Sequence, residues 1–99
     1  KEPLPSEIET VVYRVVQESL TNVLRHAEAS QVQITLEFNA KELKLQIKDN
    51  GKGMTQVDLK KGLGLLGMEE RIKLIKGEFK INSHLGQGTE INISLPIRE

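Results

Sequence analysis

Two glycine-rich segments carry residues that could do chemistry in this sequence. Asp49 begins the first segment and is followed by Gly51 and Gly53, and the second segment, residues 62–67, begins nine residues after Gly53. Glycines let a ligand approach backbone N–H groups closely, and the N-terminus of a helix favours an anion. An acid with spaced glycines, followed by a glycine cluster at a helix start, is therefore typical of a site where the main chain holds a nucleotide.

Asp49 stands at the end of an expected strand. An ionised carboxylate only accepts hydrogen bonds, so at this place it can accept one from an exocyclic amine such as that of adenine. A simpler interpretation is that Asp49-Asn50-Gly51 forms a turn, because these residues are common in turns. For the second segment, too, a turn followed by a helix start is the alternative to a phosphate-binding loop.

A third group lies on one face of an expected helix, at positions i, i+4 and i+7: Glu18, Asn22 and Arg25. The amide oxygen of Asn22 suits Mg2+, which takes one or two protein ligands besides waters and phosphate oxygens. Arg25 can hold a phosphate, and Glu18 can act as a base or orient water. The alternative is a solvated polar face, but Glu18 and Asn22 fall near the apolar stripe rather than opposite it.

Several other classes of site are excluded. The spacing Gly62-x-Gly64-x-x-Gly67 matches the dinucleotide-binding fingerprint, but no strand precedes it, and no P-loop is present. The net charge is zero and only three residues are aromatic, which argues against a nucleic-acid partner. There is no cysteine, and neither His26 nor His84 has further ligands at metal-binding spacing, so no zinc site is expected.

The chain of 99 residues is long enough for one domain, residues 1–99, with residues 1–5 as the end of a linker and Ser6 as a helix N-cap. Apolar spacing predicts one helix over residues 8–27 and a second helix that starts near Gly64. Gly77 is expected to be the residue that follows the second helix. Alternation predicts strands at 32–38, 43–47, 79–83 and 91–95. The order helix, hairpin, helix, hairpin predicts an α/β fold: a two-layer α/β sandwich with helices on one face of a mostly antiparallel sheet.

Together these residues resemble the catalytic and ATP-binding domain of a sensor histidine kinase, in the superfamily of gyrase, histidine-kinase and MutL ATPases (GHKL). The similarity covers nearly the whole chain, as four segments in the family order: residues 18–27 (N box), 49–53 (G1 box), 62–68 (G2 box) and 86–89. Residues 17–27 and 67–71 resemble the NarL-partner kinases, which include DesK-like and ComP-like sensors. Glu18 at the start of the N box and a short lid, residues 54–61, fit that group.

The resemblance implies a Bergerat-type ATP-binding fold with ATP and Mg2+ as cofactors. In the family pattern, Asp49 binds the adenine amine with support from Thr89, and Asn22 coordinates Mg2+. Glu18 is the catalytic residue. The other implied nucleotide-binding positions are Arg25, His26, Gly51, Gly53, Met54, Gly62, Leu63, Gly64 and Leu65.

The resemblance also implies transfer of the γ-phosphoryl group to a histidine on a separate helical dimerisation domain, which this sequence does not contain. We expect the sequence to be a piece of a longer bacterial kinase that is homodimeric, is anchored in the membrane and passes the phosphoryl group to a response regulator. The domain itself is expected to lie in the cytoplasm and to be monomeric when isolated. In the family fold a strand precedes the first helix. The given sequence has no room for this strand before residue 8, so we expect one edge of the sheet to be exposed. The alternatives are a hydrolytic GHKL ATPase, an anti-sigma-factor serine kinase, or a binding-only nucleotide or protein-interaction module.

Overall fold

The computed structural model describes residues 5–24, 29–53 and 65–97. The elements within these ranges are α1 (Ser6–Asn22), β1 (Val32–Phe38), β2 (Glu42–Asp49), α3 (Leu65–Leu74), β3 (Glu78–His84) and β4 (Gly88–Pro96). This order agrees with the order predicted from the sequence. The predicted N-cap is wrong by one residue, because Pro5 occupies that position and makes no side-chain capping hydrogen bond.

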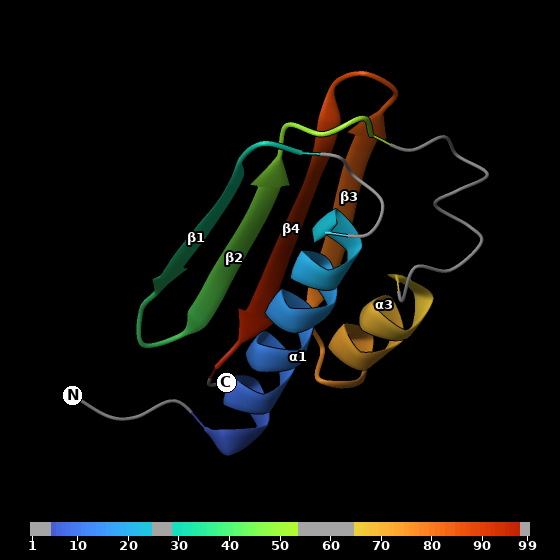
Figure 1. Cartoon of the computed structure of the whole chain (residues 1–99). Helices are drawn as coiled ribbons and strands as arrows, with labels where there is room; N and C mark the ends of the chain where they lie inside the picture. Colours follow the sequence, from blue (N-terminus) through green and yellow to red (C-terminus); the bar gives the residue numbers. More distant parts are fainter. Residues whose placement is uncertain (1–4, 25–28, 54–64, 98–99) are drawn as a thin grey trace.

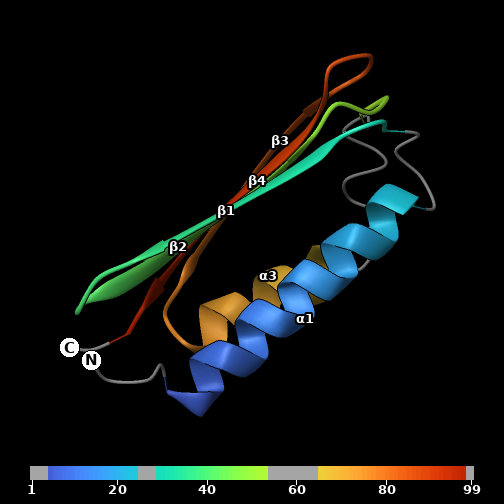
Figure 2. The ribbon, with the colours of Figure 1, turned by 60° about the vertical axis from the view of Figure 1, so that its left-hand side comes forward.

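The four strands form one antiparallel sheet in the order β1-β2-β4-β3. Both helices lie on the same face of this sheet, and the other face carries no helix among the described residues (Figures 1 and 2). This arrangement confirms the predicted two-layer α/β sandwich.

The core lies between the helices and the two central strands. Its buried side chains alternate along β2 and β4 and repeat with helical spacing on α1 and α3: Ile8, Val11, Val15, Leu43, Leu45, Ile47, Met68, Ile72, Ile91, Ile93 and Leu95. Valine is a weak helix former, so tertiary burial rather than intrinsic propensity stabilises α1.

Three apolar side chains of strand β1 are exposed, whereas those of the central strands β2 and β4 are buried. The alternation of apolar and polar residues is as predicted, yet Ile34, Leu36 and Phe38 are 42%, 46% and 52% exposed. Their register partners on β2, by contrast, are Ile47, Leu45 and Leu43, which are all buried. The apolar face of the sheet therefore extends beyond the part that the described helices cover.

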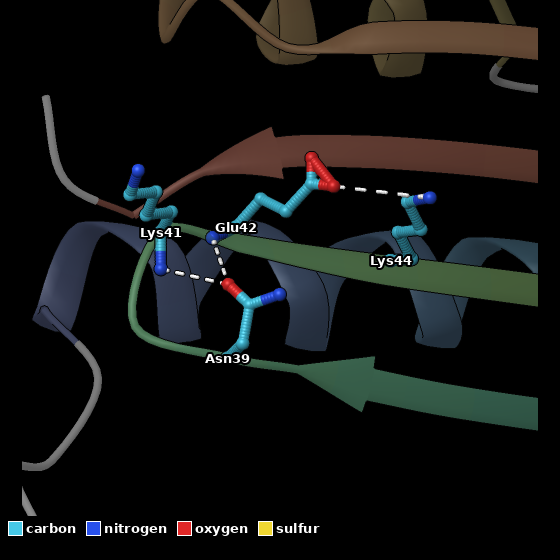
Figure 3. A network of polar contacts seen from close by, with 4 residues as sticks. All are labelled: Asn39, Lys41, Glu42 and Lys44. Carbon is cyan, nitrogen blue, oxygen red and sulfur yellow. Dashed lines mark hydrogen bonds and ion pairs between the residues drawn. The ribbon is translucent and has the colours of Figure 1, made fainter.

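The turn between β1 and β2 is held by a side chain. The Oδ1 atom of Asn39 accepts hydrogen bonds from the backbone N–H groups of Lys41, at 2.8 Å, and Glu42, at 3.0 Å (Figure 3). This is the usual way in which asparagine stabilises a turn. Lys44 and Glu42 approach to 3.8 Å on the surface, where an ion pair contributes little.

The sequence predicts Gly77 as the residue just after the second helix, a position that usually takes the left-handed conformation. Lys76 does so instead, with φ 65°. The N–H of Gly77 donates to Ile72 O at 2.9 Å and that of Lys76 to Lys73 O at 3.0 Å, which is a Schellman motif. Glycine is required at position 77 for packing, because a Cβ atom there would come within 2.8 Å of the backbone oxygen of Ser94 and within 2.7 Å of Leu95 Cδ2.

Candidate functional site

A row of three polar side chains crosses the sheet at the end where β2 finishes. Thr89 on β4 pairs in register with Asp49 on β2 and with Ser83 on β3. All three are buried, with exposed fractions of 9% for Asp49, 8% for Thr89 and 5% for Ser83. The next inward-facing row, two residues along each strand, is wholly apolar. The polar row therefore forms one end of the core.

Hydrogen bonds within this row leave acceptor capacity on the carboxylate. Ser83 Oγ and Thr89 Oγ1 lie 2.7 Å apart, and Ser83 Oγ donates to Gly88 O at 3.3 Å. Asp49 Oδ1 accepts a hydrogen bond from the N–H of Gly51 at 2.8 Å. A carboxylate has about four acceptor positions, and this bond uses one of them. The geometry thus suits a ligand that donates a hydrogen bond to Asp49.

Two loops meet beside this row through their main chains. The N–H of Gly86, in the β3–β4 loop, donates to Lys52 O at 2.6 Å. Gly53 and Gly88 have φ values of 73° and 84°, and a Cβ atom on either would overlap a backbone carbonyl, that of His84 or of Asp49 respectively. Gly53 is therefore needed for contact between the loops, a reason that the sequence analysis missed when it considered only ligand approach.

Asn50 is a structural residue that the sequence analysis treated only as part of a turn. Its Oδ1 atom accepts hydrogen bonds at 3.0 Å from the N–H groups of Ser30 and Gln31, and its Nδ2 donates to Ser30 Oγ at 2.9 Å. These bonds hold the segment after α1 against the residue that follows Asp49. A turn at residues 49–51 is therefore compatible with a binding role for Asp49.

Ser83 is the other residue that sequence reasoning missed. Its signal is its place in the inward-facing series Phe79, Ile81, Ser83, where a polar residue occupies a position that alternation assigns to the core. A buried hydroxyl at such a position needs a partner, and Thr89 supplies it.

The two candidate site residues of α1, Glu18 and Asn22, are half-buried. Glu18 and Asn22 stand one turn apart on this helix, which packs against β2 and α3 and runs toward the end of the sheet where β2 finishes (Figure 2). Their half-burial agrees with their predicted place beside the apolar stripe. Ser19, between them in sequence, is 2% exposed, and its Oγ has no hydrogen-bond partner among the described residues.

The structure thus gathers part of the predicted site at one end of the sheet. Asp49, Gly51, Gly53 and Thr89 lie together there, and α1 carries Glu18 and Asn22 toward the same end. Leu65 begins α3. The remaining predicted site residues lie outside the described residues: Arg25, His26, Met54, Gly62, Leu63 and Gly64.

The amide oxygen of the half-buried Asn22 is a donor that fits Mg2+. No group of three or more His, Cys, Asp or Glu side chains gathers within residues 5–24, 29–53 and 65–97. Mg2+ keeps several waters and needs only one or two protein ligands beside phosphate oxygens, which a half-buried asparagine satisfies.

A separate hollow lies on the helix-free face of the sheet. Its volume is about 440 Å³, and its lining includes Thr35, Lys44, Gln46 and Lys80. Gln46 Nε2 donates there to Asn92 Oδ1 at 3.0 Å. None of the predicted site residues lines this hollow, so it is distinct from the polar row.

Comparison with known proteins gives the family to which this chain belongs. Residues 7–99 match the family described as Histidine kinase-, DNA gyrase B-, and HSP90-like ATPase. The chain belongs to this family, which confirms the resemblance found in the sequence.

Two similar proteins are named histidine kinases. The chain is 42% identical over 97 residues to the signal transduction histidine-protein kinase/phosphatase DegS of Brevibacillus brevis, covering 97% of the chain and 25% of DegS. It is 42% identical over 96 residues to the oxygen sensor histidine kinase NreB of Staphylococcus carnosus (strain TM300), covering 95% of the chain and 28% of NreB. The chain therefore spans about a quarter of the length of these relatives.

Solved structures of kinase domains share the fold. The histidine kinase domain of the Erythrobacter litoralis EL346 blue-light activated histidine kinase superposes with a TM-score of 0.79 at 25% identity, covering 94% of this chain and 46% of that one. The Acinetobacter baumannii histidine kinase AdeS superposes with a TM-score of 0.75 at 22% identity, covering 91% and 47%. No helix among the described residues is long and apolar enough to cross a membrane.

Proposed function

We propose that this domain binds ATP together with Mg2+ and presents the γ-phosphoryl group to a histidine on a separate helical domain of its parent kinase. The observation that carries this proposal is the buried carboxylate of Asp49, which stands in a polar row with Thr89 and Ser83 at the end of an otherwise apolar core. Membership of the ATPase family and the 42% identity to two histidine kinases support it.

Asp49 selects the base in this proposal. Its carboxylate accepts a hydrogen bond from the exocyclic amine of adenine, while Thr89, held by Ser83, stands beside it. Guanine presents a carbonyl at the corresponding position, so two acceptors would face each other in a confined site. Sites built on such hydrogen bonds discriminate strongly, because the wrong ligand leaves a buried group unpaired.

In this proposal the phosphates are bound by Asn22, the last residue of α1, and by two residues that follow this helix in the sequence. Asn22 would supply an amide oxygen to Mg2+, which would neutralise phosphate charge, and Arg25 and His26 would contact phosphate oxygens. The glycine segment, residues 62–65, wraps the triphosphate, and Gly51, Gly53 and Met54 complete the binding positions. Phosphoryl transfer depends mainly on such positioning and charge neutralisation.

Glu18 acts during transfer rather than in binding. A carboxylate on this face can accept a proton from the attacking histidine or orient that side chain. The histidine nitrogen forms the new bond to phosphorus, and the bond to the β–γ bridging oxygen breaks, so that ADP leaves.

The parent protein supplies the acceptor. We propose a homodimeric NarL-partner-type kinase, anchored at the membrane with this domain on the cytoplasmic side, whose helical dimerisation domain carries the histidine. A response regulator then receives the phosphoryl group.

Calorimetric titration of the chain with a non-hydrolysable ATP analogue, with and without Mg2+, tests the proposal. We expect Mg2+-dependent binding, much weaker binding of the matching GTP analogue, and loss of binding in Asp49→Asn. The fold of this variant, followed by circular dichroism, should be largely retained. Equal affinities for the two analogues would contradict the role of Asp49.

Labelled ATP tests whether the acceptor histidine lies on the separate helical domain. With Mg2+, the chain alone should accumulate little stable label, and adding the parent's dimeric helical domain should restore transfer to a histidine there. Acid-labile label on His26 or His84 in the absence of that domain would contradict the proposal.

A further inference from the structure

One buried hydroxyl, that of Ser19 on α1, has no hydrogen bond in the part of the chain that the structure describes. Four polar side chains are buried there: Ser19, Asp49, Ser83 and Thr89. The three strand residues form the polar row and take part in hydrogen bonds. Ser19, by contrast, is 2% exposed, and no described residue pairs with its Oγ. A buried polar group without a partner is rare and costs free energy, so it needs an explanation.

Ser19 is the last member of the inward-facing series of α1. Four buried residues follow one face of this helix at spacings of three or four: Ile8, Val11, Val15 and Ser19. Four buried residues alternate along β2 in the same way: Leu43, Leu45, Ile47 and Asp49. In each series the first three members are apolar and the fourth is polar.

The polar members of the two series lie toward the same end of the domain. The helix α1 runs in the same direction as β2 and packs against it (Figures 1 and 2). From Ile8 to Ser19 the helix advances roughly 17 Å, and from Leu43 to Asp49 the strand advances roughly 20 Å. The hydroxyl of Ser19 therefore faces the sheet near the level of the polar row.

We infer that Ser19 is a further base-recognition residue, whose hydroxyl donates a hydrogen bond to a ring nitrogen beside the amine that Asp49 binds. This inference rests on the proposed function. The exocyclic amine of adenine is a donor, and the ring nitrogens on its two sides, N1 and N7, are acceptors. An acceptor and a donor on the protein therefore match an edge of adenine. Because Ser83 and Thr89 are hydrogen-bonded to each other, Ser19 is the hydroxyl whose bonding capacity is unused.

The hydroxyl of Ser19 is shut off from solvent in the ligand-free chain. A base that enters between α1 and the polar row must therefore part the two layers at this end of the core. On entry it supplies the partner that Ser19 lacks. The unpaired hydroxyl raises the free energy of the ligand-free state but not that of the bound state, so it favours binding.

Ser19→Ala should change stability and affinity in opposite directions. Without a ligand it removes an unpaired polar atom, and we expect the Tm to rise by roughly 3 °C or more in thermal unfolding. With Mg2+ and the non-hydrolysable ATP analogue it removes a donor, and calorimetry should show binding weakened roughly 3- to 10-fold.

Thr10→Ala is the matched control, at an exposed position of the same helix. Alanine is a better helix former than serine or threonine, so this variant measures the gain in stability from propensity alone. We expect it to raise the Tm less than Ser19→Ala does and to leave the affinity for the ATP analogue unchanged.

Base analogues test whether the hydroxyl reaches the base itself. Each of 1-deaza-ATP and 7-deaza-ATP replaces one ring nitrogen by C–H and keeps the amine. We expect one of them to bind the wild type roughly 3- to 10-fold more weakly than ATP, and to bind Ser19→Ala as tightly as it binds the wild type. A serine with only a structural role would not give this dependence. If Ser19→Ala weakened ATP and both analogues by the same factor, the inference would be overturned.

The outcomes separate this inference from the proposed function. If Asp49→Asn loses binding while Ser19→Ala binds the ATP analogue like the wild type, the proposed function stands and the role of Ser19 is wrong. If the wild type binds no nucleotide, both are wrong. A lower Tm for Ser19→Ala would also overturn the inference, because the hydroxyl would then be paired within the protein, for example with the carbonyl of Val15 one turn earlier.

Discussion

Ser83 Oγ and Thr89 Oγ1 lie 2.7 Å apart across β3 and β4, and Thr89 is in turn the register partner of Asp49. This hydrogen bond satisfies two buried hydroxyls and orients Thr89 beside the carboxylate. A residue that no motif includes, Ser83, thereby supports the residue proposed to bind the base.

We expect Thr89→Val to lower the free energy of unfolding by about 1 kcal/mol, because it keeps the shape but removes a buried hydrogen bond. It should also weaken binding of the ATP analogue. Urea denaturation and calorimetry measure the two effects. Thr10→Val, at an exposed position of α1, is the control and should change stability by less than about 0.5 kcal/mol. Unchanged nucleotide affinity in Thr89→Val would remove Thr89 from the proposed site.

The two polar residues of α1 should separate binding from transfer. Asn22→Ala removes the amide oxygen proposed for Mg2+ and should weaken Mg2+-dependent nucleotide binding roughly 10-fold or more, in line with the loss of a hydrogen bond or ligand to a charged group. Glu18→Gln keeps the shape of the side chain and should leave binding nearly unchanged while transfer slows, as loss of a general base does. If Glu18→Gln instead abolished binding and spared transfer, the two roles would be wrongly assigned.

The contact between the loops should depend on the space at Gly53. A Cβ atom there would overlap the carbonyl of His84, whereas Gly86, at a similarly positive φ of 81°, has no atom within 4 Å of such a Cβ. Gly86→Ala should therefore cost only the conformational strain, about 1 kcal/mol. Gly53→Ala should cost more than about 3 kcal/mol, since the backbone must move. Thermal unfolding of the two variants makes the comparison, and equal losses would show that the loops are not packed in this way.

The end of α3 offers a stabilising substitution. Lys76 adopts a left-handed conformation that glycine adopts without steric cost, so Lys76→Gly should raise the free energy of unfolding by roughly 1 kcal/mol. Lys73→Gly, one turn earlier and within the helix, should lower it by a similar amount. Chemical denaturation measures both, and destabilisation by Lys76→Gly would mean that the lysine side chain contributes more than its backbone strain costs.

Periodicity was sufficient to predict the order of elements and the inward face of each strand. The alternation in residues 43–47 and 91–95 places Leu45 and Ile93 inward, and both are buried. It did not predict that the same alternation on β1 leaves Phe38 half exposed. Burial depends on which elements cover a strand, and a residue pattern does not specify the position of an edge.

For the candidate site, the sequence by itself determined the residue types that could bind a nucleotide and their division between a helix, a strand end and two glycine segments. Tertiary structure decided which of them meet. Asp49 and Thr89 are 40 residues apart in sequence and become neighbours only because β2 pairs with β4 in one register. It also decided that Gly77 is required for packing while Lys76 takes the left-handed turn. The pairing of Asp49 with Thr89 and the packing of Gly77 against Leu95 both depend on contacts between distant segments, which local propensity does not contain.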